Sequence, residues 1–306
     1  MRTCVLYIGG TSRSGSTLLE CLLARRDDVV ALGEVAHLWR RGLLDNELCA
    51  CGQHFWRCPF WQSVGDRAFG GWSAVDVDRV LWLRRSVDRQ RRLLITGRRH
   101  PPSSLAAAAR EYASFYRRIY EAASAIATAP VVLDSSKVPP TAVALTHDKA
   151  INLHVMHIVR DSRGVAYSWT KTVTRPESAT RESMPRFGVG LSAAQWAAHN
   201  LEVRLIAHRG APVVRLRYED LVDDANATVR EAWSALGLPG EGGLPMSDPR
   251  TIELRPTHSV AGNPMRFRHG VTKLAPDLEW RSRMPTRERR LVTAMTFPLL
   301  RHYGYL

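Results

Sequence analysis

A turn rich in glycine and serine follows the first apolar run of the chain. The stretch Gly10-Thr-Ser-Arg-Ser-Gly-Ser-Thr17 matches the phosphate-loop spacing G-x-x-x-x-G-K-[ST] except at Ser16, where the motif has lysine. Glycines let backbone N–H groups converge on an anion, and a helix N-terminus favours negative charge. The ammonium that would reach a triphosphate is missing, although Arg13 could supply charge. We therefore expect an oxyanion site here, the alternative being an ordinary turn before a helix.

A second anion site is expected around Arg160 and Ser168, which also follow an apolar run. If a helix starts near Ser162, the Arg160 guanidinium and the Ser168 hydroxyl could face one phosphate. An ion pair of Arg160 with Asp161 or Asp134 is the competing interpretation. Two anion sites at the ends of neighbouring strands would suit a ligand with two separated phosphates.

Three further residues could carry proton or charge chemistry. Lys137 follows the apolar run Val131–Leu133, and Glu34 follows Val29–Leu32. A carboxylate such as Glu34 can accept a proton from a hydroxyl, and His37, one helical turn later, is the competing base. A solvated lysine and a helix-start carboxylate stabilised by the dipole are the alternatives for Lys137 and Glu34.

These residues are separated by short apolar runs that alternate with helical patterns. Such alternation predicts a parallel sheet covered on both faces, with ligands at the carboxyl ends of the strands. We expect helices at 17–24, 76–94, 105–126, 141–149, 164–171, 193–208, 222–236 and 287–300, and strands at 5–8, 29–32, 131–133, 153–159 and 213–216. Residues 45–69 show no clear period and are interpreted as an insertion, and residues 173–190 as a mobile loop.

Taken together, the motifs resemble those of the sulfotransferases that use 3′-phosphoadenosine 5′-phosphosulfate (PAPS), in particular bacterial members and tyrosylprotein sulfotransferases. The matching stretches are 9–18, 158–168, the Arg-Tyr-Glu-Asp-Leu run at 217–221, and 257–268, in the order of the family. The resemblance implies a single domain over residues 1–306 with a P-loop-like, three-layer α/β fold, in which a central parallel sheet is flanked by helices. It also implies a C-terminal segment, 256–306, that closes over the cofactor.

The resemblance further implies the roles of individual residues and the reaction. Lys137 and Ser259 would lie near the transferring sulfonate, Glu34 or His37 would be the base, and no metal would be needed. The acceptor would be a hydroxyl or amine of a small molecule, such as a glycan, a lipid or a secondary metabolite. The PAPS-binding residues would be Arg13, Ser14, Gly15, Ser16, Thr17, Arg160, Ser168, Tyr218, Arg266 and Arg268.

A cysteine-rich segment, Cys49-Ala-Cys51-Gly-Gln-His54-Phe-Trp-Arg-Cys58, lies inside the expected insertion. Three thiols and one imidazole could in principle hold zinc. The spacing C-x-C-x2-H-x3-C is not a common structural zinc pattern, so we expect free thiols or a local cysteine pair, with no metal.

Composition leaves two other function classes open. The chain has 43 Lys+Arg and 29 Asp+Glu, a net charge of +14, which attracts polyanions. A nucleoside or nucleotide kinase is disfavoured by Ser16, and a non-catalytic nucleic-acid binder by the dispersal of the basic residues. We expect a cytoplasmic enzyme without a membrane span, because no apolar run is long enough and the five cysteines are an odd number. The sequence does not indicate the oligomeric state.

Overall fold

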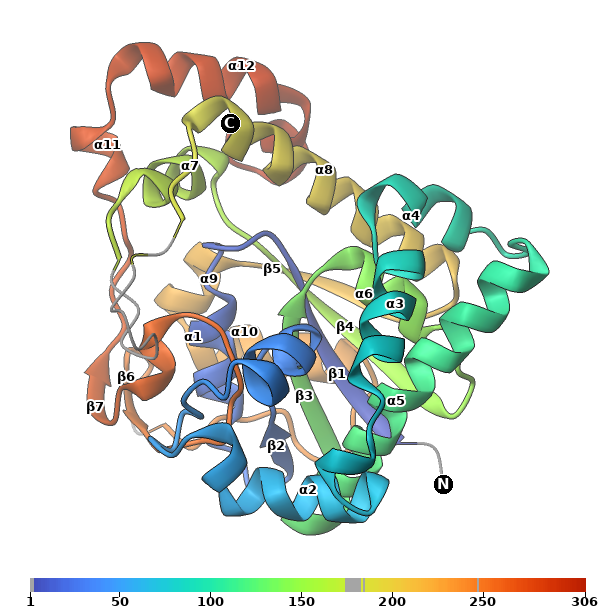
Figure 1. Ribbon diagram of the computed structural model, residues 1–306. Helices are drawn as coiled ribbons and strands as arrows, with labels where there is room; N and C mark the ends of the chain where they lie inside the picture. Colours follow the sequence, from blue (N-terminus) through green and yellow to red (C-terminus); the bar gives the residue numbers. More distant parts are fainter. Residues whose placement is uncertain (1–2, 174–182, 184, 247) are drawn as a thin grey trace.

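The computed structural model describes residues 3–173, 183, 185–246 and 248–306. Its centre is a sheet of five parallel strands in the order β2-β3-β1-β4-β5, with helices on both faces (Figure 1). This confirms the predicted α/β architecture. The strands are β1 (Thr3–Gly10), β2 (Val29–Ala31), β3 (Val131–Lys137), β4 (Ile151–Val159) and β5 (Val213–Arg217).

Helices connect these strands and also form the C-terminal part of the chain. They are α1 (Ser16–Leu23), α2 (Pro59–Phe69), α3 (Val77–Val87), α4 (Gln90–Thr96), α5 (Ser103–Ala127), α6 (Pro139–Leu145), α7 (Ser162–Thr170), α8 (Val189–His208), α9 (Tyr218–Asp223), α10 (Ala225–Ala235), α11 (Trp280–Arg283) and α12 (Thr286–His302). A separate antiparallel hairpin joins β6 (Thr251–Leu254) to β7 (Gly270–Lys273). Short 3₁₀ turns span 35–37, 55–57, 72–74 and 264–267, and a π-helical turn spans 38–44.

The sheet separates two apolar cores, because successive side chains of a strand point to opposite faces. On β1, Val5 and Tyr7 face the core that includes α2, α3, α5 and α6. Leu6 and Ile8 face the core that includes α1, α9 and α10. Burial on both faces explains why the strands appear in the sequence as continuous apolar runs.

Two predicted helices are each divided in two. The basic helix expected at 76–94 breaks between α3 and α4, where the buried Asp88 accepts hydrogen bonds from Tyr112 and Thr141. The helix expected at 222–236 is replaced by α9 and α10, between which Asp224 is extended and accepts a hydrogen bond from the backbone N–H of Ala227. In both places an aspartate takes hydrogen bonds at the break, which apolar periodicity does not reveal.

The segment 45–69 is more regular than expected, because its second half forms α2. The helix begins at Pro59 and buries one face through Trp61, Val64 and Ala68. The hairpin of β6 and β7 was not predicted either. The predicted mobile loop at 173–190 falls mostly on 174–182 and 184, outside the described residues, and α8 begins at Val189. None of the helices in the described ranges has the length and apolar character needed to cross a membrane.

Candidate functional site

A cavity of about 690 Å³ lies at the carboxyl edge of the sheet. The end of each of the five strands contributes to its wall. Ser16 follows β1, Glu34 follows β2, Lys137 ends β3, Arg160 follows β4 and Tyr218 follows β5, and all five line the cavity. The parallel sheet thus brings together residues that are up to 202 positions apart, at the edge where such sheets bind ligands.

The predicted oxyanion loop joins β1 to α1 and borders the cavity. Gly15 has φ of 93°, and a Cβ atom there would lie 2.4 Å from Cδ2 of Tyr218, so only glycine fits. Arg13 also has a positive φ, 71°, a costly conformation for a residue with a side chain. The Ser14 hydroxyl is buried and has no hydrogen-bond partner among the described residues. Of the predicted loop ligands, Arg13, Gly15, Ser16 and Thr17 line the cavity.

The predicted second anion site also faces the cavity, through Arg160 and Ser168. Helix α7 does begin at Ser162, so that Ser168 lies in its second half. The Arg160 guanidinium lies over the ring of Tyr218, 4.6 Å from its centroid, and donates to the backbone carbonyl of Arg13 at 3.2 Å. The two expected anion sites are therefore adjacent.

The ion-pair partner of Arg160 is neither Asp161 nor Asp134, the two considered from the sequence. It is Asp277, whose carboxylate and backbone carbonyl lie 3.1 and 2.9 Å from Nη2. Burial alone would raise the pKa of Asp277, but Arg160 outweighs this effect and the pKa is lowered. Asp161 pairs instead with Arg163, and Asp134 accepts from Tyr120 and Ser136.

The three residues expected to carry proton and charge chemistry lie in contact. The Lys137 ammonium donates to Oε1 of Glu34, and Oε2 of Glu34 lies 3.5 Å from Nε2 of His37. Gly33 positions this group, because its φ of 79° turns the chain so that Glu34 N–H donates to Val260 O at 2.8 Å. Lys137 has φ of 67°, so the ammonium projects from an unusual backbone position.

The protonation of this group follows from its burial and its charges. Burial alone would raise the pKa of Glu34, but the Lys137 ammonium and then His37 reverse the effect, and the pKa falls below its ordinary value. Burial lowers the pKa of His37 to about 4, despite the neighbouring carboxylate. At neutral pH, Glu34 is therefore a carboxylate and His37 a neutral imidazole.

Ser259, predicted to assist at the sulfonate, lies behind this group and does not line the cavity. It is buried and donates a hydrogen bond to the carboxylate of Glu20. The second oxygen of Glu20 accepts from Ser135 at 2.5 Å, two residues before Lys137. Glu20 was missed from the sequence, although a single carboxylate in the apolar helix α1 was a signal. Glu20 thus links Ser259 to the end of β3 that carries Lys137.

The C-terminal segment contributes one predicted binding residue to the cavity wall, and basic residues that were not predicted also line it. Arg268 lines the cavity, as do Lys273 of β7 and Arg41 of the π-helical turn. Arg266 is buried and does not line it; its guanidinium donates to Leu48 O and Ser259 O. The described lining thus includes six Lys and Arg side chains and two carboxylates, Glu34 and Asp277, so the cavity is strongly basic.

The three thiols of the cysteine-rich segment are free, one of the two states expected from the sequence, but the histidine beside them is not the one considered there. His54, considered there as the partner of the three cysteines, is exposed, and its Nδ1 lies 2.8 Å from Asn46 O. A different histidine, His258, lies beside the thiols of Cys49 and Cys58. The long sequence separation explains why it was missed.

Comparison with known proteins identifies this architecture. Among solved structures, a sulfotransferase domain from the curacin biosynthetic pathway is similar over 98% of both chains, with 16% identity and a TM-score of 0.50. A sulfotransferase domain from the Synechococcus PCC 7002 olefin synthase covers 96% of this chain and 94% of its own, with 18% identity and a TM-score of 0.46. The sulfotransferase STF1 from Mycobacterium tuberculosis H37Rv covers 78% and 68%, with 14% identity and a TM-score of 0.43.

No curated protein matches the chain. The model of the sulfotransferase family, however, matches residues 6–242, which include the oxyanion loop, Glu34, Lys137, Arg160 and Tyr218. The fold is accordingly the P-loop-like α/β fold that the motifs predicted. Because this match spans most of the chain, the protein belongs to the sulfotransferase family.

Proposed function

We propose that the protein transfers a sulfonate group from PAPS to a hydroxyl or amine of a small acceptor molecule. The strongest support for this proposal is the set of residues gathered at the carboxyl edge of the sheet. There the contacting pair Glu34 and Lys137 shares one basic cavity with the oxyanion loop and with Arg160. Membership of the sulfotransferase family supports the reaction class, and these residues support a location at this edge of the sheet.

The residues of the cavity fit a sulfonate donor with two anionic ends. The loop residues Arg13, Ser16 and Thr17 line the cavity at the start of α1, and this position suits the 5′-phosphosulfate. Arg160 and Ser168 suit the 3′-phosphate, and the ring of Tyr218 suits the adenosine between them. When bound, PAPS would supply the activated sulfonate. The loop has serine at position 16 in place of the lysine that contacts a triphosphate, which suits a donor that has no triphosphate.

Lys137 is proposed to stabilise charge that develops on the leaving oxygen. Its ammonium is almost buried, with 9% of the side chain exposed, so its charge acts in a medium of low polarity. Arg13, which also lines the cavity, is proposed to assist it. Fixed cations of this kind accelerate transfer because they need no reorganisation during the reaction.

Glu34 is proposed to accept the proton of the acceptor. It is ionised at neutral pH and faces the cavity, and its contact with Lys137 fixes its orientation. His37 is the second candidate, because its neutral imidazole also lines the cavity. We place the acceptor beside these two side chains, since a base must lie within hydrogen-bond reach of the proton it removes.

A binding comparison tests the proposed function directly. Thermal shifts of the full chain should be larger with 3′,5′-bisphosphoadenosine than with ATP and Mg²⁺, since Arg160 and the loop favour two separated phosphates. The reverse order would favour a kinase and overturn the proposal. Incubation with PAPS and a panel of phenols, sugars and amines, followed by mass spectrometry, should then detect a sulfonated acceptor and free 3′,5′-bisphosphoadenosine.

A further inference from the structure

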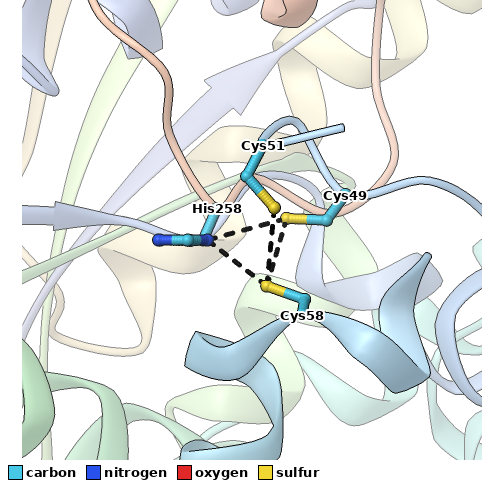
Figure 2. Close-up of side chains that lie close together, drawn as sticks. All are labelled: Cys49, Cys51, Cys58 and His258. Carbon is cyan, nitrogen blue, oxygen red and sulfur yellow. Dashed lines mark hydrogen bonds between the residues drawn. The ribbon is translucent and has the colours of Figure 1, made fainter. Parts of the chain in front are cut away.

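Four side chains that can bind metal converge outside the cavity. They are Cys49, Cys51 and Cys58 of the cysteine-rich segment, and His258, which lies 200 residues beyond Cys58. Figure 2 shows the three sulfur atoms and the imidazole turned toward one another from separate parts of the chain. All four ligand atoms lie within 4.8 Å of each other.

The distances between these atoms match those around one tetrahedral zinc ion. Zinc bonds of about 2.3 Å to sulfur and about 2.0 Å to nitrogen place two sulfur ligands about 3.8 Å apart, and sulfur and nitrogen about 3.5 Å apart. In the structure, Cys58 Sγ lies 3.7 Å from each of the sulfur atoms of Cys49 and Cys51. Nδ1 of His258 lies 3.3 Å from Cys58 Sγ and 3.9 Å from Cys49 Sγ.

Of the two states expected from the sequence, free thiols or a local cysteine pair, the pair does not describe this arrangement. All five cysteines of the chain are unpaired. Cys58 stands at the same distance from two other sulfur atoms, which is typical of a shared centre and not of one bond between two of them. We propose that Cys49, Cys51, Cys58 and His258 bind a structural zinc ion. This proposal concerns a part of the molecule separate from the transfer reaction.

The surroundings of the four residues hold them in place. Cys49 N–H donates to Gln53 O at 2.8 Å, and Gly52 N–H to Cys49 O at 2.9 Å, so a tight turn carries the first two cysteines. Cys58 directly precedes helix α2, whose N-terminus favours a thiolate.

The imidazole of His258 is fixed as well. The ring of Phe60 stacks on it, with centroids 4.7 Å apart and an interplanar angle of 10°. Trp61 Nε1 donates to the backbone carbonyl of His258 at 2.8 Å. A ligand set that is oriented in this way by neighbouring groups is a feature of metal sites.

The set of three thiolates and one imidazole selects zinc. Closed sites of this composition are structural zinc sites, whereas catalytic sites leave a position for water. Sulfur atoms 3.7 Å apart leave room for one ion and not for an iron–sulfur cluster. Cys49 and Cys58 are fully buried, which further suits a structural role.

Such an ion would join two distant segments beside the cavity. Next to His258, Ser259 accepts a hydrogen bond at its carbonyl from Ala50 N–H at 3.1 Å and donates through its hydroxyl to Glu20. The backbone carbonyl of the following residue, Val260, accepts a hydrogen bond from the backbone N–H of Glu34. Zinc would therefore fix the segment that follows His258, against which the proposed base Glu34 is positioned.

Metal analysis of the purified full chain tests the proposal. The wild type should contain about one zinc per chain by mass spectrometry of the native protein and by release on denaturation. After zinc is replaced by Co²⁺, the spectrum should show the visible bands of tetrahedral cobalt and a thiolate charge-transfer band. The proposal would be overturned if the wild type contains no zinc and, when fully reduced, gives no tetrahedral cobalt spectrum. A mass that shows a disulfide among the three cysteines would also overturn it.

Two histidine variants form a matched pair. His258→Ala should retain less than about a tenth of the zinc, while His54→Ala, which changes an exposed residue of the same segment, should retain all of it. Equal loss in both variants would contradict the ligand set. If His258→Ala does not fold, titration of the reduced, metal-free wild type with Co²⁺ still tests the site. Saturation at one ion with three thiolate bonds would support the site, and the absence of such binding would refute it.

Discussion

Arg160 and Asp277 form an ion pair on the wall of the cavity, with Nη2 of the guanidinium 3.1 Å from the carboxylate. The arginine follows β4 and the aspartate lies beyond β7, so the pair joins the sheet to the C-terminal segment. Asp277 occupies donors of Arg160 that a phosphate would also use. The proposed binding of a phosphate at Arg160 would therefore compete with this carboxylate.

Replacement of Arg160 by alanine should weaken binding of 3′,5′-bisphosphoadenosine by about 2–4 kcal/mol, because a charge-assisted contact is lost. Isothermal titration calorimetry of wild type and Arg160→Ala measures the difference. Adenosine 5′-phosphosulfate, which lacks the 3′-phosphate, is the internal control and should bind both proteins almost equally. An equal loss of affinity for both ligands would show that Arg160 does not bind the 3′-phosphate.

Replacement of Asp277 by asparagine should have the opposite effect. The variant removes the competing charge, so affinity for the bisphosphate should rise by up to about fivefold; the increase is limited because a partly exposed ion pair contributes no more than about 1 kcal/mol. The same titration measures it. A weaker affinity would mean that Asp277 supports the ligand or the closing segment and does not compete with it.

Replacement of Lys137 by alanine should lower turnover far more than it lowers affinity for the sulfonate donor. The reason is that the ammonium contact strengthens only as charge develops on the leaving oxygen. Steady-state kinetics with PAPS, together with bisphosphate titration, separate the two quantities. Normal turnover with a raised KM for PAPS would refute this role.

Replacement of Glu34 by glutamine should abolish transfer and leave bisphosphate binding unchanged, whereas His37→Ala should keep most of the activity. The carboxylate is ionised at neutral pH and is oriented by its contact with Lys137, whereas burial disfavours the imidazolium that His37 would become on accepting a proton. The reverse pattern would assign the base to His37. Two active variants would mean that neither residue is the base.

The acid limb of the pH–rate profile should respond to Lys137. Because the pKa of Glu34 lies below its ordinary value of 4.5, kcat/KM of the wild type should fall only as the pH drops through this lowered pKa. In Lys137→Ala, the ammonium is gone and burial remains, and burial raises the pKa. The acid limb of the residual activity should therefore move to higher pH. An unmoved limb would show that Glu34 does not control it.

The parts of the site that could be predicted from the sequence are those encoded locally. The oxyanion loop has its strand, glycines and helix within about twenty residues, and Glu34, Lys137 and Arg160 each lie within four residues of the end of an apolar run. A parallel sheet then places them together, because its strands all end at one edge.

The missed features depend on partners that are distant in sequence. Asp277 lies 117 positions from Arg160, and His258 lies 200 positions from Cys58, so no local spacing indicates either pair. Helix α2, in contrast, was missed although it has a local signal, because its apolar residues at 61, 64 and 68 have helical spacing. In the β6–β7 hairpin, most residues of β7 are exposed. Its short strands contain no apolar run from which they could be predicted.

The placement of Lys273 and Asp277 on the cavity wall also has a consequence for synthesis of the chain. All five strands of the sheet have been translated once Arg217 is added, yet the wall still lacks these two residues. A nascent chain on the ribosome can therefore assemble its sheet well before it can enclose a ligand. The described wall of the cavity is complete only after Asp277, 60 residues beyond the last strand of the sheet, has been made, so that ligands can stabilise the finished fold but not its early intermediates.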